Sequence, residues 1–125
     1  MTHYRKIFGD RGEDLARRFL IKKGYRILET NYRTPFGELD IVGLDGDTVA
    51  FVEVKSRRAV GCGSPLDAIN YRKQNHLIKS ALFYIGEKKY VFESYRFDAV
   101  AVVGSGLDGI ELFKNIIESD AKFSF

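Results

Sequence analysis

The sequence predicts an α/β fold in which a mixed β-sheet of about five strands is flanked by helices. Three patterns predict this class: a helical period before residue 24, successive strand patterns between residues 25 and 54, and a long helical pattern followed by further strands. Consecutive strands joined by short turns form an antiparallel meander. A helix that then returns the chain to the same sheet adds a parallel strand pair, so the sheet is expected to be mixed.

Length and composition predict one domain, residues 1–125, that folds around a single core without disulfides. The net charge of +3 and the pI of about 9.0 are compatible with nucleic-acid binding but do not require it. The single cysteine, Cys62, excludes a disulfide framework, and the histidines are too few for a zinc site. Because no stretch resembles a signal segment or a membrane span, we expect a cytoplasmic protein.

The first helix is predicted to begin at Asp10, a good N-cap residue, and to end near Lys23, with residues 1–9 forming a loose leader. Glu13 lies at the edge of the apolar stripe of this helix, which consists of Leu15, Ala16, Phe19 and Leu20. As a first-turn acid, Glu13 complements the helix dipole, and it can contribute to a functional site at the same time.

The remaining elements follow from strand and helix patterns. Tyr25–Tyr32 predicts the first strand, and a turn at residues 34–37 leads into the stretch Phe36–Arg58, which predicts two strands around an Asp-Gly turn. A second helix is predicted from a Ser64 cap to Ile85, before Gly86. The later elements are expected to be strands at Tyr90–Phe92, Arg96–Val103 and Ile110–Lys114, and a helical turn after Asn115.

Acidic and basic side chains occur together on the two central strands. Alternation places Glu53 on the same face as Lys55, and Glu38 on the same face of the preceding strand as Asp40. Burying a charge costs several kcal/mol unless the charge is paired or binds a metal. The pattern therefore indicates a structural ion pair, a solvated strand end, or a divalent-metal site in which carboxylates from neighbouring strands hold a hard cation.

The inward face of the second predicted helix is apolar in its second half and polar in its first half. Asn70, Lys73 and Gln74 occupy the polar half. A helix that packs only on a hydrophobic sheet does not need these residues. Either Lys73 extends past its neighbours into solvent, or the three residues border the same cavity as Glu53 and Lys55, and we favour the second interpretation.

Basic residues flank the candidate site. The chain after Lys55 is basic and glycine-rich, which suits contact with a nucleic-acid backbone, although it lacks the Walker A spacing. An exposed arginine has no special role by default, but Arg33 is also placed to contact phosphate. The candidates for nucleic-acid binding are Arg33, Arg57, Arg58, Lys73 and Gln74.

The order Glu13, Asp40 and then Glu53-Val54-Lys55 resembles the signature of a nuclease superfamily in which an acid precedes (Asp/Glu)-x-Lys. Within that superfamily the chain is similar to the small archaeal Holliday-junction resolvases and, more closely, to the bacterial YraN family. The matching segments cover nearly the whole chain: Gly12-Glu13, Gly24-Tyr25, Asn31-Tyr32-Arg33, Gly37-Glu38-Leu39-Asp40, Phe51-Val52-Glu53-Val54-Lys55, Pro65 with Lys73-Gln74, and Arg96-Phe97-Asp98.

The resemblance implies a restriction-endonuclease-like fold and a Mg²⁺- or Mn²⁺-dependent endonuclease acting on DNA, with branched or structured DNA as one candidate substrate. In that interpretation Asp40 and Glu53 ligate the metal, and the backbone carbonyl of Val54 adds a ligand. Lys55 orients the attacking water or offsets the developing charge. The resemblance makes Glu13 an outer ligand or a ligand of a second ion, and Glu38 is an alternative to Asp40.

Two function classes besides an endonuclease remain open. One is a non-catalytic nucleic-acid-binding or DNA-processing accessory protein on the same scaffold, which the small net charge favours. The other is a structural or interaction protein whose acid–lysine cluster is an internal ion-pair network. DNA is the expected partner, no membrane contact is expected, and a homodimer is allowed.

Overall fold

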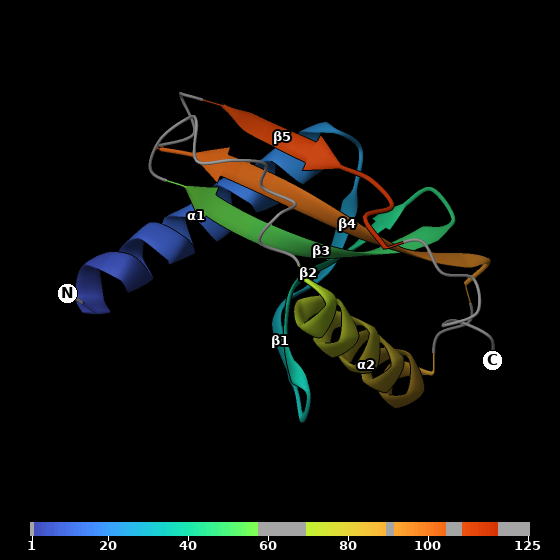
Figure 1. Cartoon of the computed structure of the whole chain (residues 1–125). Helices are drawn as coiled ribbons and strands as arrows, with labels where there is room; N and C mark the ends of the chain where they lie inside the picture. The colour runs from blue at the N-terminus through green and yellow to red at the C-terminus, as the bar shows by residue number, and fades with distance from the viewer. Residues whose placement is uncertain (1, 58–69, 90–91, 105–108, 118–125) are drawn as a thin grey trace.

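The computed structural model describes residues 2–57, 70–89, 92–104 and 109–117, with the backbone alone for residues 2–10 and 57. Two helices and five strands lie in these residues (Figure 1). In chain order they are α1 (Thr2–Lys22), β1 (Arg26–Thr34), β2 (Gly37–Asp45), β3 (Thr48–Arg57), α2 (Tyr71–Lys88), β4 (Ser94–Val103) and β5 (Ile110–Phe113).

The five strands form one mixed sheet in the order β1-β2-β3-β4-β5. The first three strands pair antiparallel, β3 pairs parallel with β4, and β5 pairs antiparallel with β4. A parallel neighbour needs a crossover connection, and α2 lies in that connection. The predicted meander and parallel return are therefore confirmed.

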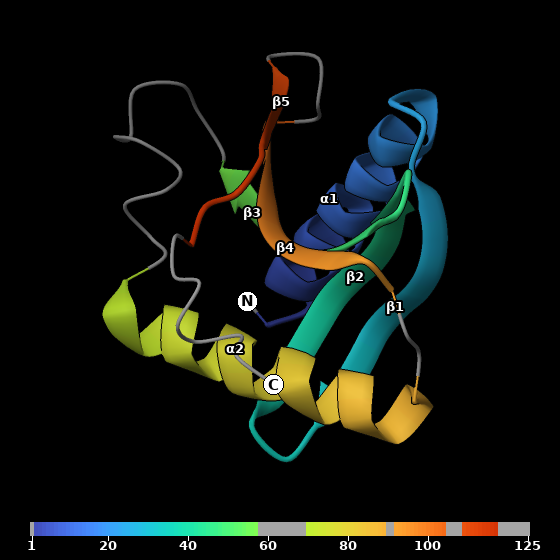
Figure 2. The same cartoon turned by 90° about the vertical axis from the view of Figure 1, so that its right-hand side faces the viewer.

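The two helices cover opposite faces of the sheet, and each face has its own core. Alternate residues of β3 divide between these cores: Phe51 packs with α2 residues such as Tyr84, and Val52 packs with α1 residues such as Leu20. Figure 2 shows α2 crossing the β1–β2 side of the sheet. The residues buried on the α1 face include Ala16, Leu20, Ile41, Ala50, Val52, Val100 and Val102.

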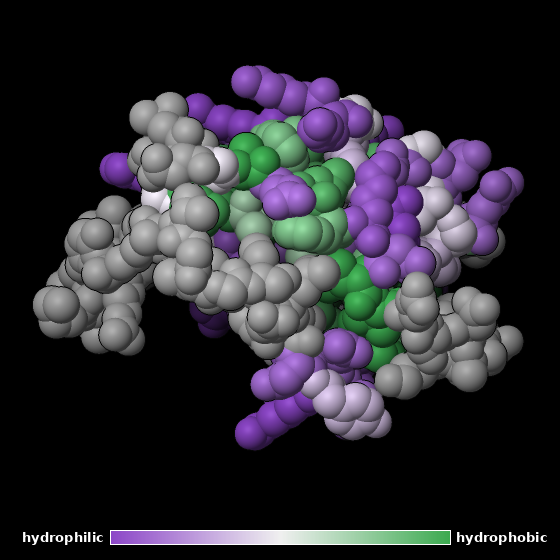
Figure 3. Space-filling model, turned by 45° about the horizontal axis from the view of Figure 1, so that its top comes forward, coloured by the Kyte–Doolittle hydropathy of each residue, from purple (hydrophilic) through white to green (hydrophobic). Residues whose placement is uncertain are grey.

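Hydrophobic and hydrophilic side chains are unevenly distributed over the surface. On the side of the molecule where β5 lies, hydrophobic side chains are framed by hydrophilic ones (Figure 3). Neither described helix is both long and apolar enough to cross a membrane.

Both helix starts differ from the predicted ones. The backbone of α1 is helical from Thr2, so the predicted leader over residues 2–9 is wrong; Asp10 is a good cap, but nothing before it prevents a helix. The first described residue before α2 is Asn70, which is extended and caps the helix by accepting a hydrogen bond from the Lys73 N–H at 2.9 Å. The predicted Ser64 cap lies outside the described residues, but a helix continuous from Ser64 through Asn70 is excluded.

The end of α2 was also predicted wrongly. Gly86 lies inside the helix, because an interior glycine costs only about 1 kcal/mol. Lys89, in the left-handed conformation at φ 55°, ends the helix and donates its N–H to the Ile85 carbonyl. Phe92 is not in a strand, whereas residues 90–91, Cys62 and the tail from 118 lie outside the described residues. The predicted helical turn is absent from residues 115–117.

A buried aspartate holds together the end of the sheet that is remote from the β1–β2 turn. Asp98 is fully buried and accepts two hydrogen bonds from Arg96 at 2.8 Å each, one from the Tyr25 hydroxyl at 2.8 Å and one from the Asn115 N–H at 3.0 Å. Arg96 also donates to Asp45 at 2.8 Å. Burial, followed by the hydrogen bond to Asp98, raises the pKa of Tyr25. The network therefore links β2, β4 and the segment after β5.

Replacement of this aspartate should destabilise the protein. Asp98→Asn removes the charge that pairs with the half-buried Arg96, and we expect it to lower the free energy of unfolding by about 3 kcal/mol. Chemical denaturation measures the loss. Asp47→Asn, at an exposed position in the β2–β3 turn, is the control. Equal stability of the two variants would contradict the structural role of Asp98.

Candidate metal centre

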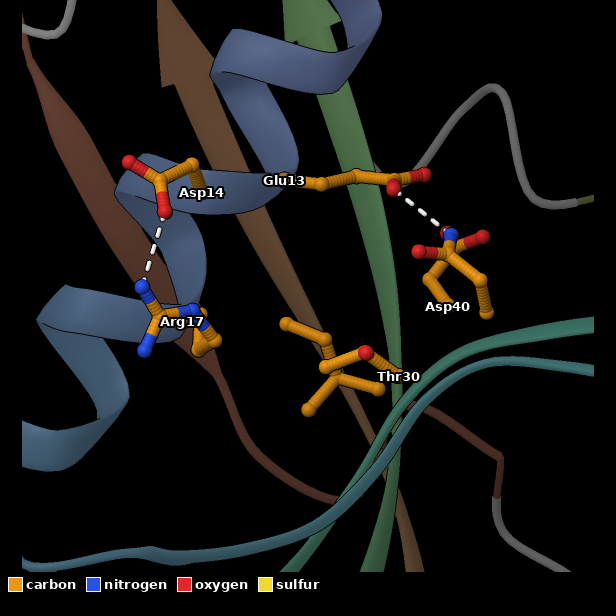
Figure 4. Close-up of a pocket in the computed structure, with 7 residues that line it drawn as sticks. Glu13, Asp14, Arg17, Thr30 and Asp40 are labelled. Carbon is orange, nitrogen blue, oxygen red and sulfur yellow. Dashed lines mark hydrogen bonds and ion pairs between the residues drawn. The ribbon is translucent and has the colours of Figure 1, made fainter.

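Three carboxylates converge where β2 begins. Glu13 comes from α1, whereas Glu38 and Asp40 come from β2, and one carboxylate oxygen of each lies within 4.8 Å of the others. Glu13 and Asp40 line a pocket of about 200 Å³ with Thr30 and other residues of α1 and β1 (Figure 4). The structure thus brings the helix acid and the two strand acids of the predicted site together.

Asn31 links two of these acids. Its side-chain Nδ2 donates to Glu13 at 2.7 Å and to Glu38 at 3.2 Å. Its backbone adopts a left-handed conformation with φ 51° inside β1. The pairing register places Asn31 opposite Asp40, between the Thr30–Ile41 and Tyr32–Leu39 pairs. Non-glycine residues with positive φ are uncommon and collect at functional sites, although asparagine tolerates this conformation better than most.

Asn31 is a site residue for which the sequence pattern predicted no role. Asparagine is unfavourable in strands, so its occurrence in a strand pattern was the signal that could have identified it. Its positive φ cannot be read from one sequence.

Asp40 is held by the backbone of the neighbouring strand. Its Oδ2 accepts the N–H of Val54 at 2.9 Å. The β2–β3 pairing extends only to Ile41 and Val52, so this carboxylate replaces a backbone acceptor where the ladder stops. Within a strand the N–H and C=O of one residue point to the same side, so the Val54 carbonyl is directed toward β2 as well. Its role as a metal ligand stays a prediction.

Glu53 brings a fourth carboxylate to the site. Its side chain is 5% exposed, and its Oε1 lies 3.4 Å from the ammonium of Lys73. Its Oε2 is buried and has no hydrogen-bond partner among the described residues. Leaving such an oxygen without a partner costs about 1–3 kcal/mol. This part of the site therefore has acceptor capacity that the described residues do not satisfy.

The surroundings of Asp40 raise the pKa of its carboxyl group. Burial is the largest cause that raises the pKa of Asp40 to about 7, and the negative charge of Glu53 is the second. The Val54 hydrogen bond and the charge of Lys73 act in the opposite direction without cancelling the rise. Two adjacent carboxylates with one nearby lysine form a site that favours either a proton or an added cation.

The predicted position of Lys73 is confirmed, because this residue reaches Glu53 from the first turn of α2. Gln74 is half-buried one residue later. Asn70, in contrast, is exposed and caps α2. Lys55 is half-buried on β3 and is paired in register with Ala101; its catalytic role stays a prediction.

The remaining basic candidates are placed only in part. Arg33 has an 89% exposed side chain whose Nε lies 3.7 Å from a Glu38 oxygen, so this pair contributes little to stability. Arg57 ends β3, but its side chain and all of Arg58 lie outside the described residues. Phosphate contacts by these arginines stay predictions.

Comparison with known proteins gives the family. Residues 12–102 match the model of a family described as uncharacterised protein family UPF0102. The chain belongs to this family. This result confirms the predicted YraN membership. The match runs from α1 into β4 and contains all the acids of the candidate metal centre.

Several UPF0102 proteins are similar over most of the chain. The one from Desulfosudis oleivorans is 42% identical over 120 residues, which cover 96% of this chain and 97% of that protein. The one from Alkaliphilus metalliredigens is 45% identical over 98 residues (78% of this chain, 86% of that protein). The one from Syntrophus aciditrophicus is 50% identical over 94 residues (75% and 74%). These names give a family and no activity.

Gly12→Ala should disturb the site through packing. An added Cβ would lie 2.0 Å from Ser56 Oγ and 3.3 Å from Ser56 Cβ, so the Ser56 hydroxyl would have to rotate and α1, which carries Glu13, would have to shift by a few tenths of an ångström. We expect a loss of about 1–3 kcal/mol in stability, partly recovered in Gly12→Ala/Ser56→Ala. Denaturation of the single and double variants measures this coupling, and unchanged stability in Gly12→Ala would show that the contact is not tight.

Asp40 should make stability dependent on pH when no divalent ion is present. Its pKa rises on folding from 3.8 to about 7, so between these values the folded protein binds a proton that the unfolded chain has lost. This contribution therefore stabilises the fold at low pH and is lost as pH rises through 7. Asp40→Asn keeps an acceptor for Val54 and should flatten this part of the curve of Tm against pH. A wild-type curve that rises from pH 5 to 8 while the variant stays parallel to it would contradict the assignment.

Proposed function

We propose that the protein is a Mg²⁺- or Mn²⁺-dependent endonuclease that hydrolyses phosphodiester bonds in DNA, with Asp40 and Glu53 as the principal metal ligands. The observation that carries the proposal is the buried Oε2 of Glu53, which has no hydrogen-bond partner among the described residues, next to a carboxyl whose pKa is raised to about 7.

The donor set fits a hard divalent cation. The available ligands are oxygens, namely the carboxylates of Asp40, Glu53 and Glu13 and the carbonyl of Val54. Mg²⁺ and Mn²⁺ prefer such ligands over nitrogen or sulfur. Glu38 adds a further carboxylate from the exposed side of the cluster.

The side chains have separate tasks in this proposal. When bound, the cation supplies charge that polarises the scissile phosphate and lowers the pKa of an attacking water. The Val54 N–H fixes the orientation of Asp40, and Lys73 limits the repulsion around Glu53. Lys55 orients the water or offsets charge developing on the phosphate. Glu13 supports the inner ligands as an outer ligand or holds a second ion.

The kind of DNA follows from resemblance. Along the chain, Asp40, the hairpin and Glu53-Val54-Lys55 follow one another in an order similar to that found in restriction-endonuclease-like nucleases. These nucleases include the archaeal Holliday-junction resolvases. This similarity favours branched or structured DNA.

The second candidate function is a non-catalytic nucleic-acid-binding or DNA-processing accessory protein on the same scaffold. The observation that favours it is the net charge of only +3, which is small for a protein that binds a DNA junction. Fold and family membership do not decide between these candidates, since one fold hosts different functions.

Glu53→Gln separates the candidates. This variant keeps the shape of the side chain and removes one ligand charge, so an enzyme should lose metal-dependent cleavage by about 100-fold or more while DNA affinity stays equal or rises. In a structural network the same change leaves Lys73 without its buried partner and mainly lowers Tm. Cleavage, DNA affinity and Tm are measured together on linear, single-stranded and four-way-junction DNA with Mg²⁺ or Mn²⁺.

Glu93→Gln, at an exposed position before β4, is the matched control. It should leave all three quantities unchanged. A wild-type protein that cuts none of these substrates with either ion would contradict the endonuclease proposal, and retained DNA binding would then favour the accessory protein.

A further inference from the structure

Lys73, His76 and Lys79 form a row along α2, because residues three apart are neighbours on a helix surface. The row extends over about 9 Å at 1.5 Å per residue. At one end the Lys73 ammonium lies 3.4 Å from Glu53. At the other end the Lys79 ammonium lies 5.9 Å from the ring centroid of Phe36. The row therefore leads from the candidate metal centre to the β1–β2 turn.

The charge distribution on α2 opposes helix stability. The first turn contains Arg72 and Lys73 and no acidic residue, although the helix dipole favours negative charge there. The helix sequence contains no acid before Glu87. A helix that breaks a stabilising rule in this way has a surface suited to bind an anion.

Phe36 is presented at a fixed position at the end of the row. Its side chain is 45% exposed, which makes it one of the few large hydrophobic residues with that exposure among the described residues. Its N–H donates to the Thr34 hydroxyl at 3.0 Å, and that hydroxyl lies 2.9 Å from the hydroxyl of Ser80 on α2. The turn that carries the ring is thus tied to the helix that carries the cations.

We propose that this surface binds an unpaired nucleic-acid strand at the metal centre, with the α2 row along its phosphates and a base stacked on Phe36. The inference rests on the proposed function and specifies its substrate: a single strand, or a single-stranded segment next to the scissile phosphate. An aromatic ring binds the face of a base, which is accessible only when the base is unstacked.

Binding measurements test the strand and the ring. Fluorescence anisotropy in EDTA compares a labelled single strand, a duplex with a single-stranded overhang and a blunt duplex of the same sequence. Phe36→Ala should weaken binding of the first two by about five-fold or more and leave the blunt duplex within about two-fold. Phe36→Tyr should restore the affinity. The control is Leu82→Ala, which removes an exposed apolar side chain from α2 instead of from the β1–β2 turn. It should leave the affinities for all three substrates unchanged.

The salt dependence of binding tests the row formed by Lys73, His76 and Lys79. Lys79→Gln should weaken binding of all three substrates and lower the slope of log affinity against log salt by about one. Lys22→Gln, at the exposed end of α1, is the matched control and should leave the slope unchanged. Equal slopes in wild type and Lys79→Gln would overturn the role of the row.

The outcomes separate this inference from the endonuclease proposal. If Phe36→Ala weakens binding of single strand and blunt duplex equally, or of neither, the stacking role is overturned even when the protein is an active nuclease. If Phe36→Ala selectively weakens single-strand binding but the wild type cleaves nothing, the inference holds and the endonuclease proposal fails.

Discussion

The candidate site depends on two neighbouring carboxylates of like charge, the buried Glu53 and the partly buried Asp40. Asp40 and Glu53 are close enough that burial and their like charges raise the pKa of Asp40 to about 7. One lysine, Lys73, lies beside them and leaves one oxygen of Glu53 unsatisfied among the described residues. The arrangement is therefore stable with a shared proton and less stable once both groups ionise. A divalent cation can replace that proton and keep both carboxylates charged.

The sheet topology brings the charged residues of the candidate site together. The two-residue turn after Asp45 sets the β2–β3 register, and the ladder stops after Ile41 and Val52, where the Asp40 carboxylate enters. The parallel β3–β4 pair requires a crossover, and α2 in that crossover returns over β1 and β2 with Lys73 at its start. On the opposite face, close packing at Gly12 brings α1 to β3 and Glu13 to the acids.

Strand alternation made much of this predictable. A strong period of two placed Asp40 and Glu53 on neighbouring strands, and the polar half of the second helix placed Lys73 near Glu53. The start of α2 was not predictable from caps alone, because Ser64 and Asn70 are both good N-cap residues. The left-handed conformation of Asn31 was not predictable from the sequence, because it accompanies hydrogen bonds to Glu38 on the neighbouring strand and to Glu13 on α1.

The protein itself shows how it buries an acid for structure alone. Asp98 has no exposure and receives four hydrogen bonds, two of them from Arg96, so both of its oxygens are satisfied. Glu53 is buried almost as deeply, yet among the described residues it has one lysine at 3.4 Å and one oxygen without a hydrogen-bond partner. Stability alone would favour an apolar residue or a complete network at that position. The contrast between these two acids in one sheet is the physical reason to assign the Glu53 end to binding and the Asp98 end to folding.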